Sequence, residues 1–211
     1  MTVRTHLLAL ACALGLGACS STPTHYYTLI APPTQAQANT TQAPFQFEMQ
    51  PVLMAVQVDQ PPLVVRQGDG SLAILENERW GAPLGDEFHD ALTGELERRF
   101  GVRDLAGLPK QNELPVLSIR TDVRRFESII GQYALTDVVW SLALRNTGNT
   151  GNTGNSGKRQ TLTCSSVIRQ PAGAGIENLV LAHQKAVSTL ADIIAKTAAD
   201  WARQPATRCP S

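Results

Sequence analysis

The chain has 211 residues, a length that suits one domain preceded by a short leader. Its 18 Lys and Arg residues are matched by 18 Asp and Glu residues, so the formal net charge is zero. A nucleic-acid-binding surface would gather basic charge in one region, and this balance argues against such a partner.

The N-terminal segment has the pattern of a lipoprotein signal peptide. Arg4 supplies a positive charge, and residues 7–16 form an apolar run of about ten residues, about half of what a helix needs to cross a bilayer. Two small residues then precede Cys19. This order predicts cleavage after residue 18 and lipidation of Cys19, which would anchor the chain to a membrane. Cys12 is the alternative acceptor, but it lies inside the apolar run.

The residue after the expected lipidation site bears on localisation. Ser20, rather than Asp, follows Cys19. By resemblance to sorted bacterial lipoproteins, Ser at this position favours the outer membrane, with the domain facing the periplasm. Cleavage removes one basic residue and no acidic residue, so the mature chain would carry a slight negative charge.

The composition divides the chain into four segments. A short strand is expected at 25–30, and a stretch rich in Pro, Gln, Thr and Ala follows at 32–44, without apolar periodicity, as in a flexible link. The expected segments are a signal peptide at 1–18, a lipid anchor and flexible tether at 19–44, a globular domain at 45–203 and a C-terminal tail at 204–211.

The first half of the domain predicts strands followed by a helix. Apolar residues alternate over 52–58, an extended run at 63–66 follows a Pro-Pro break, and the turn formers at 68–70 lead to a return strand at 71–76. A helix should then begin near Pro83 and end at Gly101. Its apolar stripe recurs every four residues and consists of Leu84, Phe88, Leu92, Leu96 and Phe100.

The second half predicts three strands and a long helix. The strands are expected at about 115–123, 134–145 and 159–169, with an Asn-Thr-Gly repeat at 146–157 interpreted as an expanded hairpin loop. The helix is expected at about 176–202. This order predicts an α+β fold, in which two amphipathic helices pack on one face of a mainly antiparallel sheet.

The sequence shows no pattern of catalytic chemistry. The mature chain would contain three histidines, His25, His89 and His183, and none belongs to a His, Cys and Asp cluster with metal-ligand spacing. It has no nucleophile elbow, phosphate-binding loop or dinucleotide fingerprint. We therefore expect neither an enzyme nor a bound metal or cofactor.

Two cysteines remain after Cys19. Cys164 lies on the inward face of an alternating strand, and Cys209 lies in the polar tail. An oxidising compartment allows a disulfide between them, which would hold the tail on the sheet. The alternative is two separate thiols.

Trp80 stands at a corner between a strand and a helix, next to Pro83 and Leu84. One interpretation is structural, with Trp80 packed on the first helical turn as a hydrophobic staple. The other is functional, with these three residues contacting a partner through an aromatic anchor.

The order of these motifs resembles that of the ABC-type transport auxiliary lipoproteins of the PqiC type. The lipobox is followed by Tyr26-Tyr27-Thr28-Leu29, a Val-rich strand that ends near Pro61, a hairpin, and Trp80, Pro83 and Leu84 at the start of an amphipathic helix. The resemblance covers about residues 25–203. It implies a non-catalytic outer-membrane lipoprotein that docks an inner-membrane-anchored MCE-domain protein, supports phospholipid transport and maintains outer-membrane integrity.

The resemblance also suggests self-association, because a ring-shaped MCE partner favours a symmetric homo-oligomer. Two other functions remain open at this point. A periplasmic lipid carrier would need an unfilled apolar cavity, and an assembly lipoprotein would help to insert outer-membrane proteins.

Overall fold

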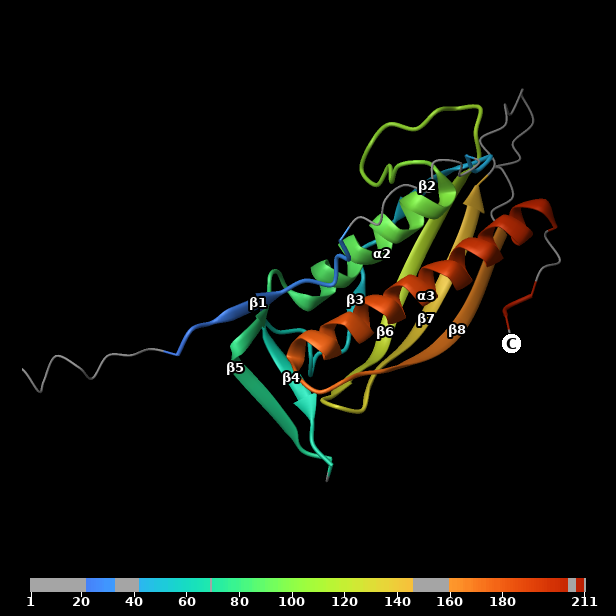
Figure 1. Ribbon diagram of the computed structural model, residues 1–211. Helices are drawn as coiled ribbons and strands as arrows, with labels where there is room; N and C mark the ends of the chain where they lie inside the picture. Colours follow the sequence, from blue (N-terminus) through green and yellow to red (C-terminus); the bar gives the residue numbers. More distant parts are fainter. Residues whose placement is uncertain (1–21, 33–41, 69, 146–159, 205–207, 211) are drawn as a thin grey trace, which may run out of the picture.

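The computed structural model describes residues 22–32, 42–68, 70–145, 160–204 and 208–210. These residues form two helices and two sheets, which confirms the predicted α+β class. Figure 1 shows the two helices side by side on one face of the larger sheet. The expected signal peptide, the lipidation site Cys19 and the Asn-Thr-Gly repeat at 146–157 lie outside the described residues.

The larger sheet is built on three long antiparallel strands that follow one another in the sequence. They are β6 (Val116–Ile129), β7 (Tyr133–Arg145) and β8 (Gln160–Pro171). Their alternating apolar residues face the helices, because one face of the sheet is buried and side chains alternate along a strand. In this register Thr121, Trp140 and Cys164 lie opposite one another, and all three are buried.

Two short strands pair with β6 in parallel, a feature that the sequence did not predict. They are β2 (Gln46–Met49) and β3 (Leu53–Met54). The strand expected over 52–58 is wrong beyond Met54, because the chain turns there and the Val58 N–H donates to the Ala55 carbonyl at 3.0 Å. Val56, in this turn, is 86% exposed.

The smaller sheet has the strand order β1-β5-β4. Its strands are β1 (His25–Tyr27), β4 (Pro62–Arg66) and β5 (Leu72–Trp80). β4 and β5 form an antiparallel hairpin with a shift in register between Pro62 and Leu63. β1 runs parallel to β5, with His25 opposite Glu78. The segment that would follow the lipid anchor is therefore part of the folded domain.

The helices are α2 (Leu84–Phe100) and α3 (Ile176–Arg203). All five residues of the predicted α2 stripe are buried in the core. Gly101 ends α2 with a φ of 65°, a left-handed conformation that costs glycine little, and its N–H donates to the Glu97 carbonyl. α3 buries Val187, Leu190 and Ile194 against the sheet and α2.

An ion-pair network joins the two helices. The Glu95 carboxylate on α2 accepts hydrogen bonds from Arg98, Arg99 and the Ser188 hydroxyl on α3. Arg99 also donates from Nε to Asp192 at 2.7 Å and from Nη2 to the Ser188 carbonyl at 2.9 Å. Although burial opposes ionisation, these donors lower the pKa of Glu95. The network fixes how α2 lies beside α3.

Candidate functional site

The segment after β1 is fastened to α2 by a buried carboxylate. Glu87, in the first turn of α2, accepts hydrogen bonds from the Thr28 hydroxyl at 2.7 Å and the Leu29 N–H at 2.9 Å. The Gln184 side chain of α3 donates to the Thr28 carbonyl at 2.9 Å. Leu29 itself belongs to the core. We call Thr28, Leu29 and Glu87 the anchor clamp.

Neighbouring contacts extend the anchor clamp along β1. The Tyr27 hydroxyl donates to Glu78 at 2.7 Å, and the Gly81 N–H donates to the Tyr27 carbonyl at 2.8 Å. Burial and the Glu78 carboxylate raise the pKa of Tyr27, so the phenol remains a donor. A Cβ on Gly81 would lie 3.0 Å from a Glu87 carboxylate oxygen, so the clamp needs a small residue there. The chain that leads to Cys19 is thus held firmly from His25 onward.

The residues considered for a partner contact lie mostly in the core. Trp80 is 4% exposed, and its ring meets those of Phe126 and His183 edge to face. Leu84 is also buried, and only Pro83, at the start of α2, is exposed. Trp80 and Leu84 therefore have almost no surface to offer a partner, and packing accounts for their positions.

His183 is enclosed by the same cluster. Its imidazole stacks on Phe126 with centroids 3.9 Å apart, and burial lowers its pKa to about 3. A substrate has no access to this ring. In the described part of the chain, no three His, Cys, Asp or Glu side chains gather closely enough to hold a metal ion. No helix among the same residues is long and apolar enough to cross a membrane.

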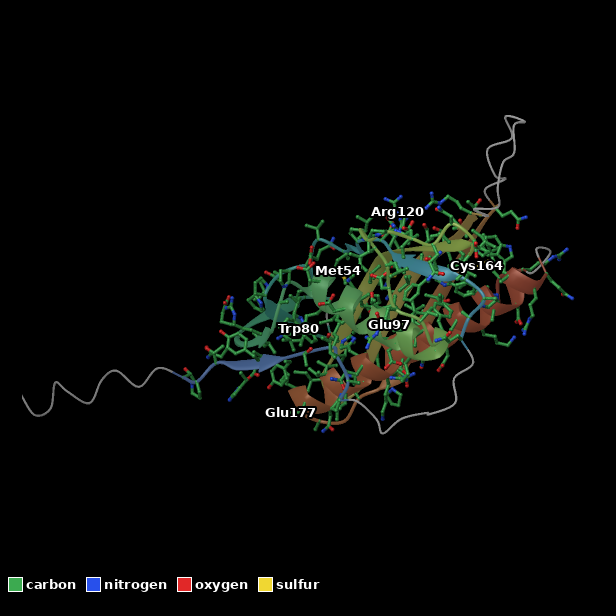
Figure 2. All side chains as sticks on the ribbon, turned by 90° about the horizontal axis from the view of Figure 1, so that it is seen from above. Met54, Trp80, Glu97, Arg120, Cys164 and Glu177 are labelled. Atoms are coloured by element: carbon green, nitrogen blue, oxygen red, sulfur yellow. A yellow bond between two sulfur atoms is a disulfide. The ribbon has the colours of Figure 1, made fainter. Side chains whose placement is uncertain are left out.

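Cys164 and Cys209 are joined in the structure by a disulfide, with the sulfur atoms 2.04 Å apart. Cys164 is buried on β8, whereas Cys209 is exposed. The bridge holds residues 208–210 against the sheet, and Figure 2 shows Cys164 toward the opposite end of the molecule from Trp80.

A groove of about 880 Å³ lies at the end of the molecule opposite β1. The C-terminal half of α2 and the loop at 101–115 form its walls, as Figure 1 allows the reader to follow. Its lining combines apolar and charged side chains, among them Phe45, Val102, Leu105, Glu97, Arg98 and Arg103. We call this feature the distal groove.

Hydrogen bonds hold the loop of the distal groove in place. The Gln46 side chain donates to the Gln111 carbonyl at 2.9 Å and accepts from the Gln111 N–H at 2.7 Å. Asp104 accepts from the Met49 N–H at 2.8 Å, and its own N–H donates to Glu97 at 2.9 Å. The groove is therefore formed before any partner binds. The sequence analysis did not predict this groove, because the loop at 101–115 has no apolar periodicity and its contacts are with the distant strand β2.

The described residues form a domain with two helices on one face of the larger sheet and with the segment after β1 hydrogen-bonded to α2. The chain belongs to the family of ABC-type transport auxiliary lipoprotein components, whose model matches residues 27–195. The match confirms the predicted membership of the transport auxiliary lipoprotein family.

Solved structures share this fold at low sequence identity. One, of an uncharacterized protein, has a TM-score of 0.60 and 14% identity, covering 83% of this chain and 98% of its own. Another, of a protein from Xanthomonas campestris, has a TM-score of 0.59 and 17% identity, covering 87% and 100%. At these identities the likeness concerns the fold alone. Among curated proteins, none matches the sequence.

Proposed function

We propose that the chain is a non-catalytic outer-membrane lipoprotein, lipidated at Cys19, that docks an MCE-domain protein anchored in the inner membrane. Together they would move phospholipid across the envelope and maintain outer-membrane integrity. Membership of the transport auxiliary family supports the general role. The observation that carries the docking role is the position of the distal groove, at the far end of the molecule from β1.

The chain length before β1 supports this orientation. Five residues lie between Cys19 and His25, the first residue of β1. Even a fully extended chain of this length spans only about 20 Å. A lipid on Cys19 would therefore keep the β1 end close to the membrane, and the distal groove would face the periplasm. A partner that arrives from the inner membrane would meet this end first.

The lining of the distal groove suits a protein segment better than a hydrocarbon chain. Glu97, Arg98 and Arg103 line it beside apolar residues, and an acyl chain would remove water from these charges without replacing their hydrogen bonds. A peptide can offer polar and apolar groups together. Leu108, on the loop of the groove, is 56% exposed and is available to such a partner. These features favour docking over a lipid carrier.

Photo-crosslinking of the full-length protein in cells would test the docking role. A photoreactive amino acid would replace Leu108 near the distal groove or, as a control, the exposed Leu181 on α3. We expect capture of the MCE-domain protein at position 108 and little capture at position 181. Equal capture at both positions, or no MCE-domain protein at 108, would contradict the proposal. Stoichiometric phospholipid on the purified protein would favour the carrier instead.

Self-association is part of the proposal, because a ring-shaped partner favours a ring of docked copies. β8 ends the strand order of the larger sheet, so copies have an edge through which they can pair. Mass photometry of the lipidated protein in detergent would measure the assembly, and a monomer at all concentrations would rule the ring out.

A further inference from the structure

The β4–β5 hairpin exposes apolar side chains on one face. Leu72 is 46% exposed and Ile74 is 49% exposed, both on β5. In the hairpin register Arg66 lies opposite Leu72, and Val64 lies opposite Ile74. Side chains that lie opposite one another in an antiparallel pair share a face, so these four residues lie on one face of the hairpin, where Val64 is buried and Leu72 and Ile74 are exposed.

A cavity of about 260 Å³ lies beside this surface, between the hairpin, the turn at 55–58 and strand β6. Its apolar wall consists of Val58, Val64 and Phe126, together with Leu72. Its charged lining consists of Arg66, Arg124, Arg125 and Glu127. Three arginines therefore face one carboxylate, and the cavity is positively charged.

Glu127 is the acidic residue in this lining, whereas Asp122 and Asp137, which lie near Arg124 and Arg125, are outside it. One carboxylate oxygen of Glu127 forms an ion pair with Arg66 at 3.1 Å and accepts a hydrogen bond from Arg125 at 2.9 Å. Arg124 pairs with Asp122 at 3.0 Å. The Nε atom of Arg66 is buried and has no hydrogen-bond partner among the described residues. The side chains of Arg66 and Arg125 are 37% and 51% exposed, so an anionic group can reach them from outside.

The anchored strand places this hairpin close to the membrane. β1 pairs with β5 at Glu78–Trp80, and the chain from Cys19 to His25, with five residues between them, spans about 20 Å at most. A lipid on Cys19 would thus lie within that distance of the β1–β5 pairing. Figure 1 shows β1, β4 and β5 together at one end of the molecule, away from the loop of the distal groove.

We propose that the β4–β5 hairpin is a second membrane contact, which binds the phospholipid head-group layer that holds the lipid anchor. Leu72 and Ile74 enter the interface, where isolated apolar side chains replace contact with water by contact with acyl chains. Arg66 and Arg125 bind lipid phosphate, which matches the geometry of a guanidinium. We call this the head-group surface. It rests on the lipidation of Cys19 in the proposed function and does not depend on the partner.

The length of the tether favours a membrane over a protein as the occupant. An anchored chain remains in contact distance of the bilayer, so weak contacts suffice to hold the surface there. Two separated apolar side chains with a cluster of arginines offer little buried area to a protein, whose interfaces bury about 800 Å² on each side. Polybasic clusters beside lipid anchors gain strength from anionic lipids, so the contact should depend on lipid charge.

Photo-crosslinking to lipid would test the head-group surface. The full-length lipidated protein would be placed in liposomes of phosphatidylethanolamine with phosphatidylglycerol, with a photoreactive amino acid replacing Leu72, Ile74 or the exposed Val167 of β8. Intact mass spectrometry would count phospholipid adducts and confirm lipidation in the same spectrum. We expect several-fold more adducts at positions 72 and 74 than at position 167. Equal yields at all three would overturn the proposal.

Charge variants would separate head-group binding from mere proximity. Arg66→Gln and Arg125→Gln should each lower the adduct yield at position 74, most strongly in liposomes rich in phosphatidylglycerol. Arg103→Gln removes one exposed charge at the distal groove and should leave the yield unchanged. Thermal unfolding would show that the variants remain folded. Equal effects of all three variants would overturn the role of the arginines.

The outcomes distinguish this surface from the proposed docking. Protein adducts in place of lipid adducts at position 74 in cells would overturn the head-group surface and leave docking intact. If intact mass spectrometry shows that the purified full-length protein carries no lipid, both proposals are overturned, because both include lipidation of Cys19. If position 108 captures no MCE-domain protein while lipid adducts form at positions 72 and 74, only the docking role is overturned.

Discussion

The imidazole Nε2 of His183 lies 2.8 Å from the hydroxyl oxygen of Ser128. This hydrogen bond joins helix α3 to strand β6 inside the core. Nδ1 of the same ring is buried and has no hydrogen-bond partner among the described residues. A second proton on this ring would have no acceptor. The histidine is therefore held neutral by its position.

This neutrality should make the stability depend on pH. Burial lowers the pKa of His183 from 6.5 to about 3. Below about pH 6.5 the imidazole is therefore protonated in the unfolded chain but remains neutral in the folded chain. The stability that the packed, neutral His183 contributes is fully present above about pH 6.5 and is lost as the pH falls toward about 3. We expect the free energy of unfolding to fall by up to about 1.4 kcal/mol per pH unit between about pH 6 and pH 5.

Urea denaturation over this pH range would measure the effect. His183→Gln should remove most of the slope, whereas His89→Gln, at the partly exposed face of α2, should keep it. The same slope in both variants would contradict the assignment to His183.

Glu95→Ala should loosen the contact between the helices. The substitution leaves Arg99 half-buried without its carboxylate partner on the same helix, and Ser188 loses an acceptor. We expect a loss of about 2–3 kcal/mol in the free energy of unfolding, measured by chemical denaturation. Asp200→Ala removes a partly exposed carboxylate of α3 whose partners Lys196 and Arg203 are exposed, so this substitution should change the stability little. Similar losses in the two variants would contradict a special role for the Glu95 network.

Cys209→Ser should destabilise the chain by about 2–4 kcal/mol, because the disulfide closes a long loop in the unfolded chain. The two cysteines are 45 positions apart. Peptide mapping without reductant would first show the Cys164–Cys209 bridge directly. Wild-type protein treated with reductant should then match Cys209→Ser in thermal unfolding. A wild-type protein with two free thiols would contradict the bridge.

Glu87→Ala should release the anchor clamp. The Thr28 hydroxyl and the Leu29 N–H lose their acceptor, so Leu29 should leave the core more often. Hydrogen exchange measured by mass spectrometry should speed up over residues 25–30, and the rest of the domain should keep its protection. Asp86→Ala, the exposed neighbour on the same turn, should show no such change. Uniformly faster exchange would indicate general destabilisation instead.

Local patterns predicted the helices and the long strands well. Leu84 to Phe100 repeats apolar residues at helical spacing and ends at Gly101, and the structure has α2 in that range. β6, β7 and β8 alternate and follow one another in the sequence without an intervening helical pattern, so the chain order indicated their antiparallel pairing. Each of these signals is contained within one segment.

Features that depend on distant partners were not predictable. β2 pairs in parallel with β6, about 70 positions further along the chain, and nothing in residues 46–49 indicates this partner. The alternation over 52–58 was misleading, because the chain must turn at Ala55 before it enters β4. Trp80 admitted two interpretations because its neighbours Phe126 and His183 come from later elements.

The anchor clamp has a consequence for how copies would find their partner. A lipid on Cys19 would be joined to the folded domain by only five residues, so β1 could not move more than about 20 Å from the leaflet. Every copy in the leaflet would then carry its distal groove at a common height above the bilayer. The search for a partner would reduce from three dimensions to lateral diffusion in one plane.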